Sequence, residues 1–230
     1  MHSRNPDVIR LANLLCRTPS AVSLKLGNFA RLDPTLRARG IQGAAHGSKS
    51  DEIVWNEFYR DWEGLAFESE RLLAQFHGTP IEQSVEIELP DANFEGKERE
   101  AIVRLRVNQN FFRSAVLTAY NNRCCISGIA MPDLLNASHI VPWSIDLENR
   151  VNPGNGLCLN VLLDRAFDRG LLTVTPDHIV KISQRVKEHN VDSGLNDNLI
   201  CFHNQKITLP DRFVPKPEFL HYHSTVIYKG

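Results

Sequence analysis

The segment that most restricts the possible folds is residues 137–170, ASHIVPWSIDLENRVNPGNGLCLNVLLDRAFDRG. An apolar run at 134–141 predicts a strand that carries His139 near its end. The residues that follow are rich in Asn, Pro and Gly, which predicts a polar loop. A second apolar run at 157–167 predicts a helix, on which Asp164 and Asp168 are four residues apart and share one face. The segment therefore predicts a compact strand, loop and helix.

The composition places the chain among ordinary globular proteins. Its 230 residues are 42% hydrophobic and 23% charged, which argues against disorder, collagen-like structure and coiled coil. No apolar run approaches the ~20 residues of a membrane helix, and the charged start, MHSRNPDVIR, does not resemble a signal peptide. We therefore expect a cytoplasmic protein. The five cysteines form no CxxC pair, which predicts reduced thiols.

The pattern along the chain predicts two domains of an α+β protein. Residues 1–77 have helical periodicity throughout, and Thr18-Pro19 is a strong helix start because Thr caps and Pro fits the first turn. Gly64 is the expected break in the long helical stretch that follows. Residues 78–100, with several Pro, Gly and acidic residues, predict a linker. Residues 101–230 then form the second domain.

The charge is asymmetric between segments. Residues 1–40 carry seven Lys/Arg and two acids, whereas residues 41–110 carry seven Lys/Arg and fourteen acids. Two short helices joined by a tight turn near residue 18 give the outline of a helix-turn-helix, which any helical hairpin shares. On this hypothesis the DNA-binding residues are Arg17, Lys25, Arg31 and Arg37. Two alternatives stay open: a solvated basic surface, and a helical unit whose acidic stretch 51–100 binds another protein.

Further elements are expected around the central segment. A helix is predicted at 111–120, and short strands are predicted at 85–89 and 124–127. Residues 171–174 and 179–183 flank Thr-Pro-Asp-His, which predicts a hairpin. A closing helix is predicted at 215–226.

The central segment resembles the HNH endonuclease family, the ββα-metal nucleases. The similarity is to the branch whose motif runs Ala-x-His-Ile-x-Pro-Trp, Asn-Gly-Leu-x-Leu and Leu-His-Asp-x-Ala-Phe-Asp-x-Gly. The corresponding pieces here are Ala137–Trp143, Asn155–Leu159 and Leu162–Gly170. Flanking similarity continues at Phe112–Tyr120, Arg123–Gly128, Pro210–Phe213 and Leu220–His223, so the resemblance covers roughly residues 101–230.

The resemblance implies an activity and roles for residues. It implies hydrolysis of DNA phosphodiester bonds with a divalent cation, Mg²⁺ or Mn²⁺. His139 corresponds to the general base, and Asn155 corresponds to the residue that holds the loop so that the imidazole is aimed correctly. Asn155 also fits a simple helix N-cap. The family further implies a bacterial restriction or anti-phage setting, and a homodimer is a candidate arrangement because cutting two strands needs two sites.

One position departs from the family motif. The family's final histidine, usually a metal ligand, falls at Leu163, and leucine cannot coordinate a metal. Two accounts remain open at this point. Either the site is impaired and the protein binds DNA without cutting it, or an oxygen from Asp164, Asn160 or Asp168 replaces the missing ligand.

Overall fold

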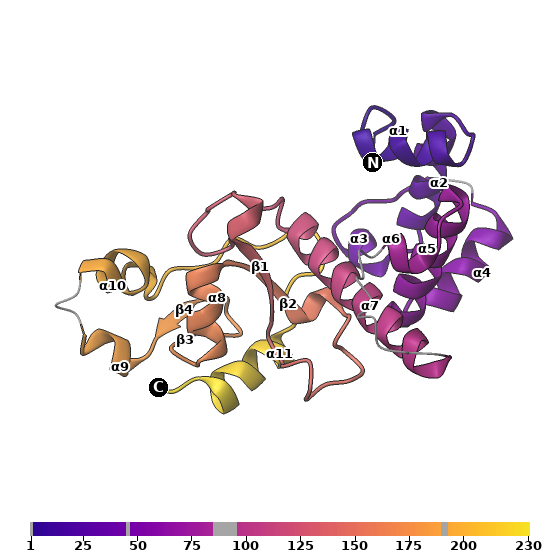
Figure 1. Cartoon of the computed structure of the whole chain (residues 1–230). Helices are drawn as coiled ribbons and strands as arrows, with labels where there is room; N and C mark the ends of the chain where they lie inside the picture. The colour runs from indigo at the N-terminus through magenta and orange to yellow at the C-terminus, as the bar shows by residue number, and fades with distance from the viewer. Residues whose placement is uncertain (1, 45–46, 85–95, 190–192) are drawn as a thin grey trace. The chain divides into compact units, whose positions relative to one another are not determined.

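The computed structural model describes residues 2–44, 47–84, 96–189 and 193–230 (Figure 1). The chain divides into two compact units, Met1–Val107 and Asn108–Gly230, which we describe separately. The division falls inside the long helix α7, Lys97–Ala119. Among the described residues, no helix combines the length and apolarity that crossing a membrane requires.

The described part of the first unit is entirely helical, as the periodicity predicts. Its helices are α1 (Pro6–Leu14), α2 (Pro19–Ala30), α3 (Pro34–Ala38), α4 (Lys49–Phe58), α5 (Trp62–His77), α6 (Ile81–Ser84) and the first part of α7. The predicted linker thus contains α6 and the start of α7. The strand predicted at 85–89 lies outside the described residues.

Helix caps explain where these helices begin. Thr18 Oγ1 accepts a hydrogen bond from the backbone N–H of Ala21 at 3.2 Å, ahead of Pro19, as expected. The break between α4 and α5 comes at Asp61, which caps the N–H of Gly64. Gly64 is therefore not the break itself. A side chain at that position would collide with the Asp61 carboxylate, so glycine leaves room for the cap.

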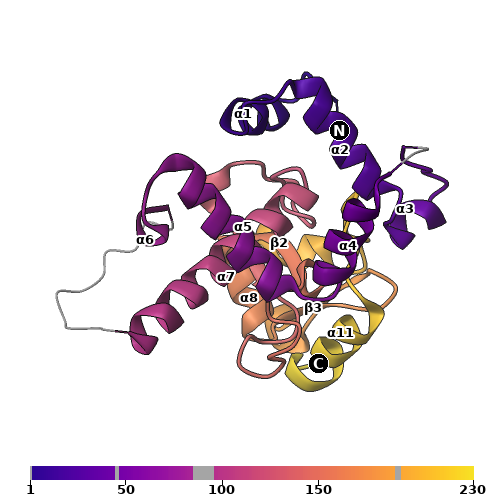
Figure 2. The same cartoon turned by 90° about the vertical axis from the view of Figure 1, so that its right-hand side faces the viewer.

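The pair α1 and α2 forms a small helical hairpin (Figure 2). Its core consists of Val8, Ala12 and Val22, with Leu11 and Leu26 packed against them. A core of this size contributes little hydrophobic free energy, so contacts elsewhere in the unit must help to fix α2.

The second unit combines helices with two small antiparallel sheets. After α7 come β1 (Leu135–His139), β2 (Gly156–Asn160), α8 (Val161–Asp168), β3 (Leu172–Val174), β4 (Val180–Ile182), α9 (Gln184–Lys187), α10 (Ser193–Asn198) and α11 (Pro217–Tyr222). The pairs β1–β2 and β3–β4 form the two sheets. The second pair confirms the predicted hairpin. Helix α11 continues directly into a π-helical turn, His223–Ile227, which confirms the closing helix predicted at 215–226.

The first sheet and α8 lie at the centre of this unit (Figure 1). In the β1–β2 register, Leu135 is opposite Asn160 and His139 is opposite Gly156. All five residues of β2 are buried, and Leu157 and Leu159 belong to one large hydrophobic core. That core fixes β1, and with it the position of His139.

Two elements predicted from the sequence are wrong. The helix predicted at 157–167 is a strand up to Asn160, and α8 begins only at Val161. A short apolar run buried on both faces has no alternation to mark it as a strand, so it resembles the start of a buried helix. The strand predicted at 124–127 is a turn, in which Cys125 N–H donates to the carbonyl of Cys158 in β2.

Candidate active site

His139 lies at the end of β1 between two aromatic rings. Its imidazole stacks on Phe112 of α7, with ring centroids 3.8 Å apart and planes 10° apart. Trp143 approaches its edge, with centroids 5.4 Å apart. These rings desolvate the imidazole, which lowers the pKa of His139 below its usual 6.5. This lowering favours the neutral imidazole at pH 7.

A backbone carbonyl selects the tautomer of His139. Nε2 lies 2.8 Å from the carbonyl oxygen of Arg150, and because a carbonyl only accepts, Nε2 carries the proton. Nδ1 is then the unprotonated nitrogen. No group of the described residues hydrogen-bonds to Nδ1, so it is available as a proton acceptor.

Asn155 closes the loop between β1 and β2 at its base. The side chain is fully buried, and its Nδ2 donates to the carbonyl of Val141 at 3.0 Å. Its Oδ1 accepts from the N–H of Val141 at 2.8 Å. Asn155 is not the cap of α8, because Asn160 takes that position. The two bonds to Val141 fix the backbone two residues after His139.

Further polar side chains hold the same loop. Asn149 N–H donates to Asp146 Oδ1 at 3.0 Å, and Asn152 Nδ2 donates to Asn149 Oδ1 at 3.0 Å. Asn152 Oδ1 in turn accepts from Gly154 N–H at 3.0 Å. This chain of bonds brackets Arg150, whose carbonyl orients His139. The sequence shows the Asn-rich loop, but it does not show that a backbone carbonyl inside it meets the imidazole.

Two carboxylates of α8 lie near His139. Asp164 accepts hydrogen bonds from the hydroxyl of Ser138 and from Asn136 Nδ2, the latter at 2.7 Å. Asp168 is one turn further along the helix. Partial desolvation, followed by the charge of Asp164, raises the pKa of Asp168. Because the charge of Asp164 acts on Asp168, the two carboxylates form one negatively charged part of the site.

One cavity of about 590 Å³ brings these groups together. It is lined by side chains of α7, β1, the following loop, α8 and the C-terminal segment. Its members are Gln109, Phe112, Arg113, Asn136, Ala137, Ser138, His139, Pro142, Trp143, Asp164, Asp168, His223 and Ile227. The predicted residues His139, Asp164 and Asp168 thus share one cavity.

Residues 124–175 match a family model described as HNH endonuclease. This segment is an HNH endonuclease domain. It spans the antiparallel pair β1–β2, helix α8 and strand β3, which confirms the resemblance noted in the sequence. No curated protein was found to match the chain.

His223 is a second histidine that lines the cavity of the HNH domain. It stacks on Phe167, with centroids 3.6 Å apart. Its Nε2 lies 3.2 Å from the carbonyl oxygen of Phe167, and its Nδ1 lies 2.8 Å from the hydroxyl of Thr173. Burial lowers the pKa of His223 to about 4. Both nitrogens are satisfied, so His223 is a packing residue, in contrast to His139.

Asn160, a predicted metal ligand, and Leu163, which stands at the family's usual ligand position, both have structural contacts. Asn160 Oδ1 accepts from the N–H groups of Leu162 and Leu163, both at 3.0 Å, and its Nδ2 donates to Ser127 Oγ. The Asn160 carboxamide is thus used to cap α8 and to bind Ser127, which does not favour the prediction that it is a metal ligand. Leu163 has no exposed surface and packs in the hydrophobic core. Asp164, the next residue, faces the cavity instead.

The two carboxylates that line the cavity, Asp164 and Asp168, suit a hard divalent cation such as Mg²⁺. No group of three His, Cys, Asp or Glu side chains that could hold a metal occurs among the described residues. Mg²⁺ does not need such a group, because it commonly binds one or two carboxylates together with water and substrate phosphate. Asp164 and Asp168 fit this mode, and the bonds to Asp164 from Ser138 and Asn136 would orient its carboxylate.

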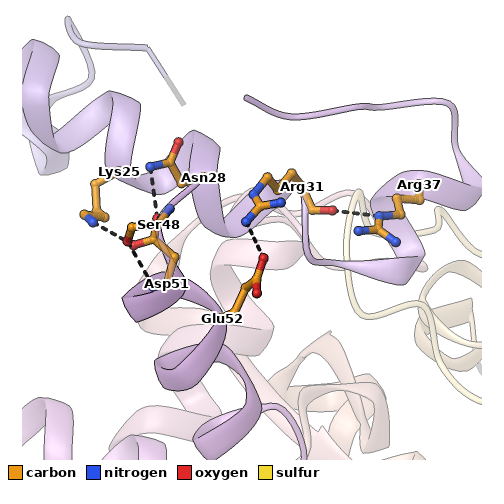
Figure 3. A network of polar contacts seen from close by, with 7 residues as sticks. All are labelled: Lys25, Asn28, Arg31, Arg37, Ser48, Asp51 and Glu52. Carbon is orange, nitrogen blue, oxygen red and sulfur yellow. Dashed lines mark hydrogen bonds and ion pairs between the residues drawn. The ribbon is translucent and has the colours of Figure 1, made fainter. Parts of the chain in front are cut away.

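Outside the HNH domain, three of the four predicted DNA-binding residues make contacts within the protein (Figure 3). Lys25 Nζ lies 2.6 Å from Asp51 Oδ1, and Arg31 Nη2 lies 2.8 Å from Glu52 Oε1. Arg37 Nε donates to the carbonyl of Arg31 at 2.7 Å. The first two contacts tie α2 and its C-terminal cap to the start of α4, and the third ties α3 to the end of α2. Contact between DNA and these residues, or the exposed Arg17, stays a prediction.

Proposed function

We propose that this chain is a metal-dependent DNA endonuclease that hydrolyses phosphodiester bonds with His139 as general base. The observation that carries the proposal is the state of the His139 imidazole. Its Nε2–H is committed to the Arg150 carbonyl, its pKa is lowered by burial, and Nδ1 remains free to accept a proton. A base of this kind is what water activation near neutral pH requires.

The chemistry needs a proton acceptor at Nδ1 of His139. Nδ1 takes a proton from water while the water oxygen bonds to phosphorus, and the bond from phosphorus to the leaving oxygen breaks. The leaving oxygen keeps the electron pair of that bond and takes a proton from solvent, and the imidazolium then returns its proton to solvent. Asn155 acts as a positioning residue, because its two bonds to Val141 hold the loop that presents the imidazole and the Arg150 carbonyl. The planar stack on Phe112 restricts rotation of the ring.

Asp164 and Asp168 would hold the divalent cation. A bound Mg²⁺ or Mn²⁺ supplies positive charge for the phosphate and its transition state. The pair also explains why the cavity needs a cation, since two carboxylates would otherwise repel a phosphodiester. Partial burial, and after it the charge of Asp164, raises the pKa of Asp168, so this carboxylate lies in a site that already carries negative charge.

The alternative is a protein that binds DNA without cutting it. Its basis is leucine at position 163, where the family motif has a histidine. The side chain of Leu163 is buried in the core rather than directed at the cavity, whereas Asp164 lines it. This arrangement favours the second account, in which an α8 carboxylate provides the oxygen ligand.

The wider setting follows only from the family. A restriction or anti-phage nuclease acts on foreign DNA in the bacterial cytoplasm, and cutting both strands is simplest for a homodimer with two sites. We propose the same setting and arrangement for this chain.

Cleavage of a supercoiled plasmid tests the proposal. The full chain should nick or linearise the plasmid with Mg²⁺ or Mn²⁺ and should be inactive in EDTA. His139→Ala should lower the rate at least 100-fold, whereas His221→Ala, which changes an exposed histidine of α11, should not change it. Equal cleavage by wild type and His139→Ala, or no cleavage with any divalent cation, would contradict the proposal.

A further inference from the structure

Helix α7 presents one continuous face to the cavity. Gln109, Phe112 and Arg113 follow the i, i+3, i+4 spacing of a helix face, and all three line the cavity. The role of Phe112 is already apparent from its stack on His139. Arg113 is the adjacent residue on this face, and neither the packing nor the proposed chemistry above uses its charge.

The charge of Arg113 is not neutralised by the acids of the cavity. The cavity holds two carboxylates, Asp164 and Asp168, and the arginines that act on the charge of Asp168 are Arg165 and Arg169. Within the described ranges, Arg113 forms no ion pair with any carboxylate. Its side chain is exposed to solvent, so its guanidinium can reach an incoming anion.

We infer that Arg113 binds a backbone phosphate of DNA in the cavity, next to the phosphodiester bond presented to His139. The inference rests on the proposed nuclease function and adds a phosphate-binding residue to it. Arginine suits this task because its planar guanidinium can donate two parallel hydrogen bonds to phosphate oxygens.

The position of Arg113 gives the contact a consequence for the geometry of the substrate. Phe112 fixes one face of the imidazole, and Arg113 follows it directly on the same helix. A phosphate held by Arg113 is therefore held by the element that also orients the base. A well-ordered helix places such a pair more reproducibly than two separate loops do.

DNA binding at several salt concentrations tests the inference with a readout other than activity. We would measure the anisotropy of a labelled DNA duplex with full-length His139→Ala protein at fixed Mg²⁺, so that the duplex is not cut. Arg113→Ala should weaken the Kd about 10-fold and reduce the slope of log K against log salt by about one. Arg113→Lys should restore the slope but not the full affinity, because lysine keeps the charge and loses the two-bond contact.

Arg185→Ala is the matched control. It removes an equal charge from an exposed position on α9 of the same unit, outside the cavity lining. It should change neither Kd nor slope. If Arg113→Ala and Arg185→Ala bind DNA equally, the inference is wrong. Should Arg113→Ala fold poorly, Arg113→Gln compared with Arg113→Lys decides the same question, since both keep a long polar side chain and only lysine keeps the positive charge.

Cleavage assays separate this failure from failure of the proposed function. If wild type cuts and His139→Ala does not, while Arg113→Ala cuts and binds like Arg185→Ala, only the role of Arg113 is wrong. If wild type neither cuts nor binds DNA, the nuclease function itself is wrong and the inference is overturned with it.

Discussion

Nε2 of His139 donates a hydrogen bond to the carbonyl oxygen of Arg150, 2.8 Å away, across the loop that joins β1 and β2. Arg150 also places its guanidinium carbon 5.4 Å from the centre of the Trp143 ring, which itself approaches the edge of His139. One loop residue thus contacts the imidazole through its backbone and the neighbouring indole through its side chain. The orientation of His139 therefore depends on the order of the whole loop.

Among the loop residues, Asn155 should have the strongest effect on the conformation of the loop between β1 and β2. Asn155→Ala removes both bonds to Val141 and leaves a buried N–H and a buried carbonyl unsatisfied, at a cost of about 2–4 kcal/mol of unfolding free energy. We expect a lower midpoint in urea unfolding and a fall in kcat larger than the change in KM.

Asn152→Ala is the comparison for Asn155→Ala. It loses bonds within the loop but leaves the link to Val141 intact, so its effect on kcat should be smaller. A larger loss of activity in Asn152→Ala than in Asn155→Ala would show that the link to Val141 does not position the base.

Leu163→His tests which residue of α8 belongs to the site. If position 163 were the vacant metal position, this change would raise activity. Because Leu163 has no exposed surface, we expect it instead to lower the unfolding free energy by about 2–4 kcal/mol without any gain in metal-dependent cleavage.

The neighbouring variant Leu162→His provides the control on the same helix. Leu162 is 45% exposed, so its replacement should be tolerated with less than about 1 kcal/mol of destabilisation. A gain of cleavage in Leu163→His, with the fold intact, would contradict the account in which a carboxylate of α8 replaces the missing histidine.

His223 should make the stability of the second unit depend on pH. Its pKa is about 4 in the folded protein and 6.5 as the ordinary value, so the unfolded chain binds the proton first as the pH falls. Stability is therefore lost between pH 6.5 and pH 4, by roughly 3 kcal/mol if His223 acts alone.

Thermal unfolding of wild type and His223→Phe across this pH range measures the effect. Phenylalanine cannot take up a proton, so this variant should lose less stability on acidification, whatever its stability at pH 7. Parallel pH profiles for the two proteins would show that burial of His223 is not the cause.

The Lys25–Asp51 pair should make the stability of the first unit depend on pH in a more acidic range. The hydrogen bond from Lys25 is the main cause that lowers the pKa of Asp51 from 3.8 to about 2. The contribution of this carboxylate is present above about pH 4 and is lost as the pH falls through 2. Lys25→Met should raise the pKa of Asp51, measured by NMR of the carboxyl carbon. Arg10→Met, which breaks the exposed pair of Arg10 with Asp7, is the control and should leave the pKa of Asp51 unchanged.

Local signals in the sequence predicted much of the first unit. Thr18 and Pro19 mark the start of α2 because capping depends on adjacent residues. The partners of Lys25 and Arg31 could not be predicted in the same way. These residues bind Asp51 and Glu52, more than 20 positions away, and only the fold decides that the basic side chains meet this helix start.

The candidate active site, like the first unit, was predictable only in part. His139 at a strand end and the carboxylates of α8 follow from periodicity and from the family motif. The role of Asn160 was not predictable, because β2 lacks the alternation that would mark it as a strand, and the start of α8 was therefore misplaced. The partner of His139 was hidden as well, since every residue has a carbonyl and only the loop conformation selects that of Arg150.

The central claim is that His139 is the base, and substitution alone tests it imperfectly because His139 also packs against Phe112. The most direct measurement is the pH dependence of cleavage at limiting DNA, compared with the pKa of His139 determined by NMR on the free protein. We predict that log rate falls with a slope of one below a single pKa, that this pKa lies under 6.5, and that it equals the NMR value for His139. A rate that stays constant while His139 becomes protonated would contradict the account.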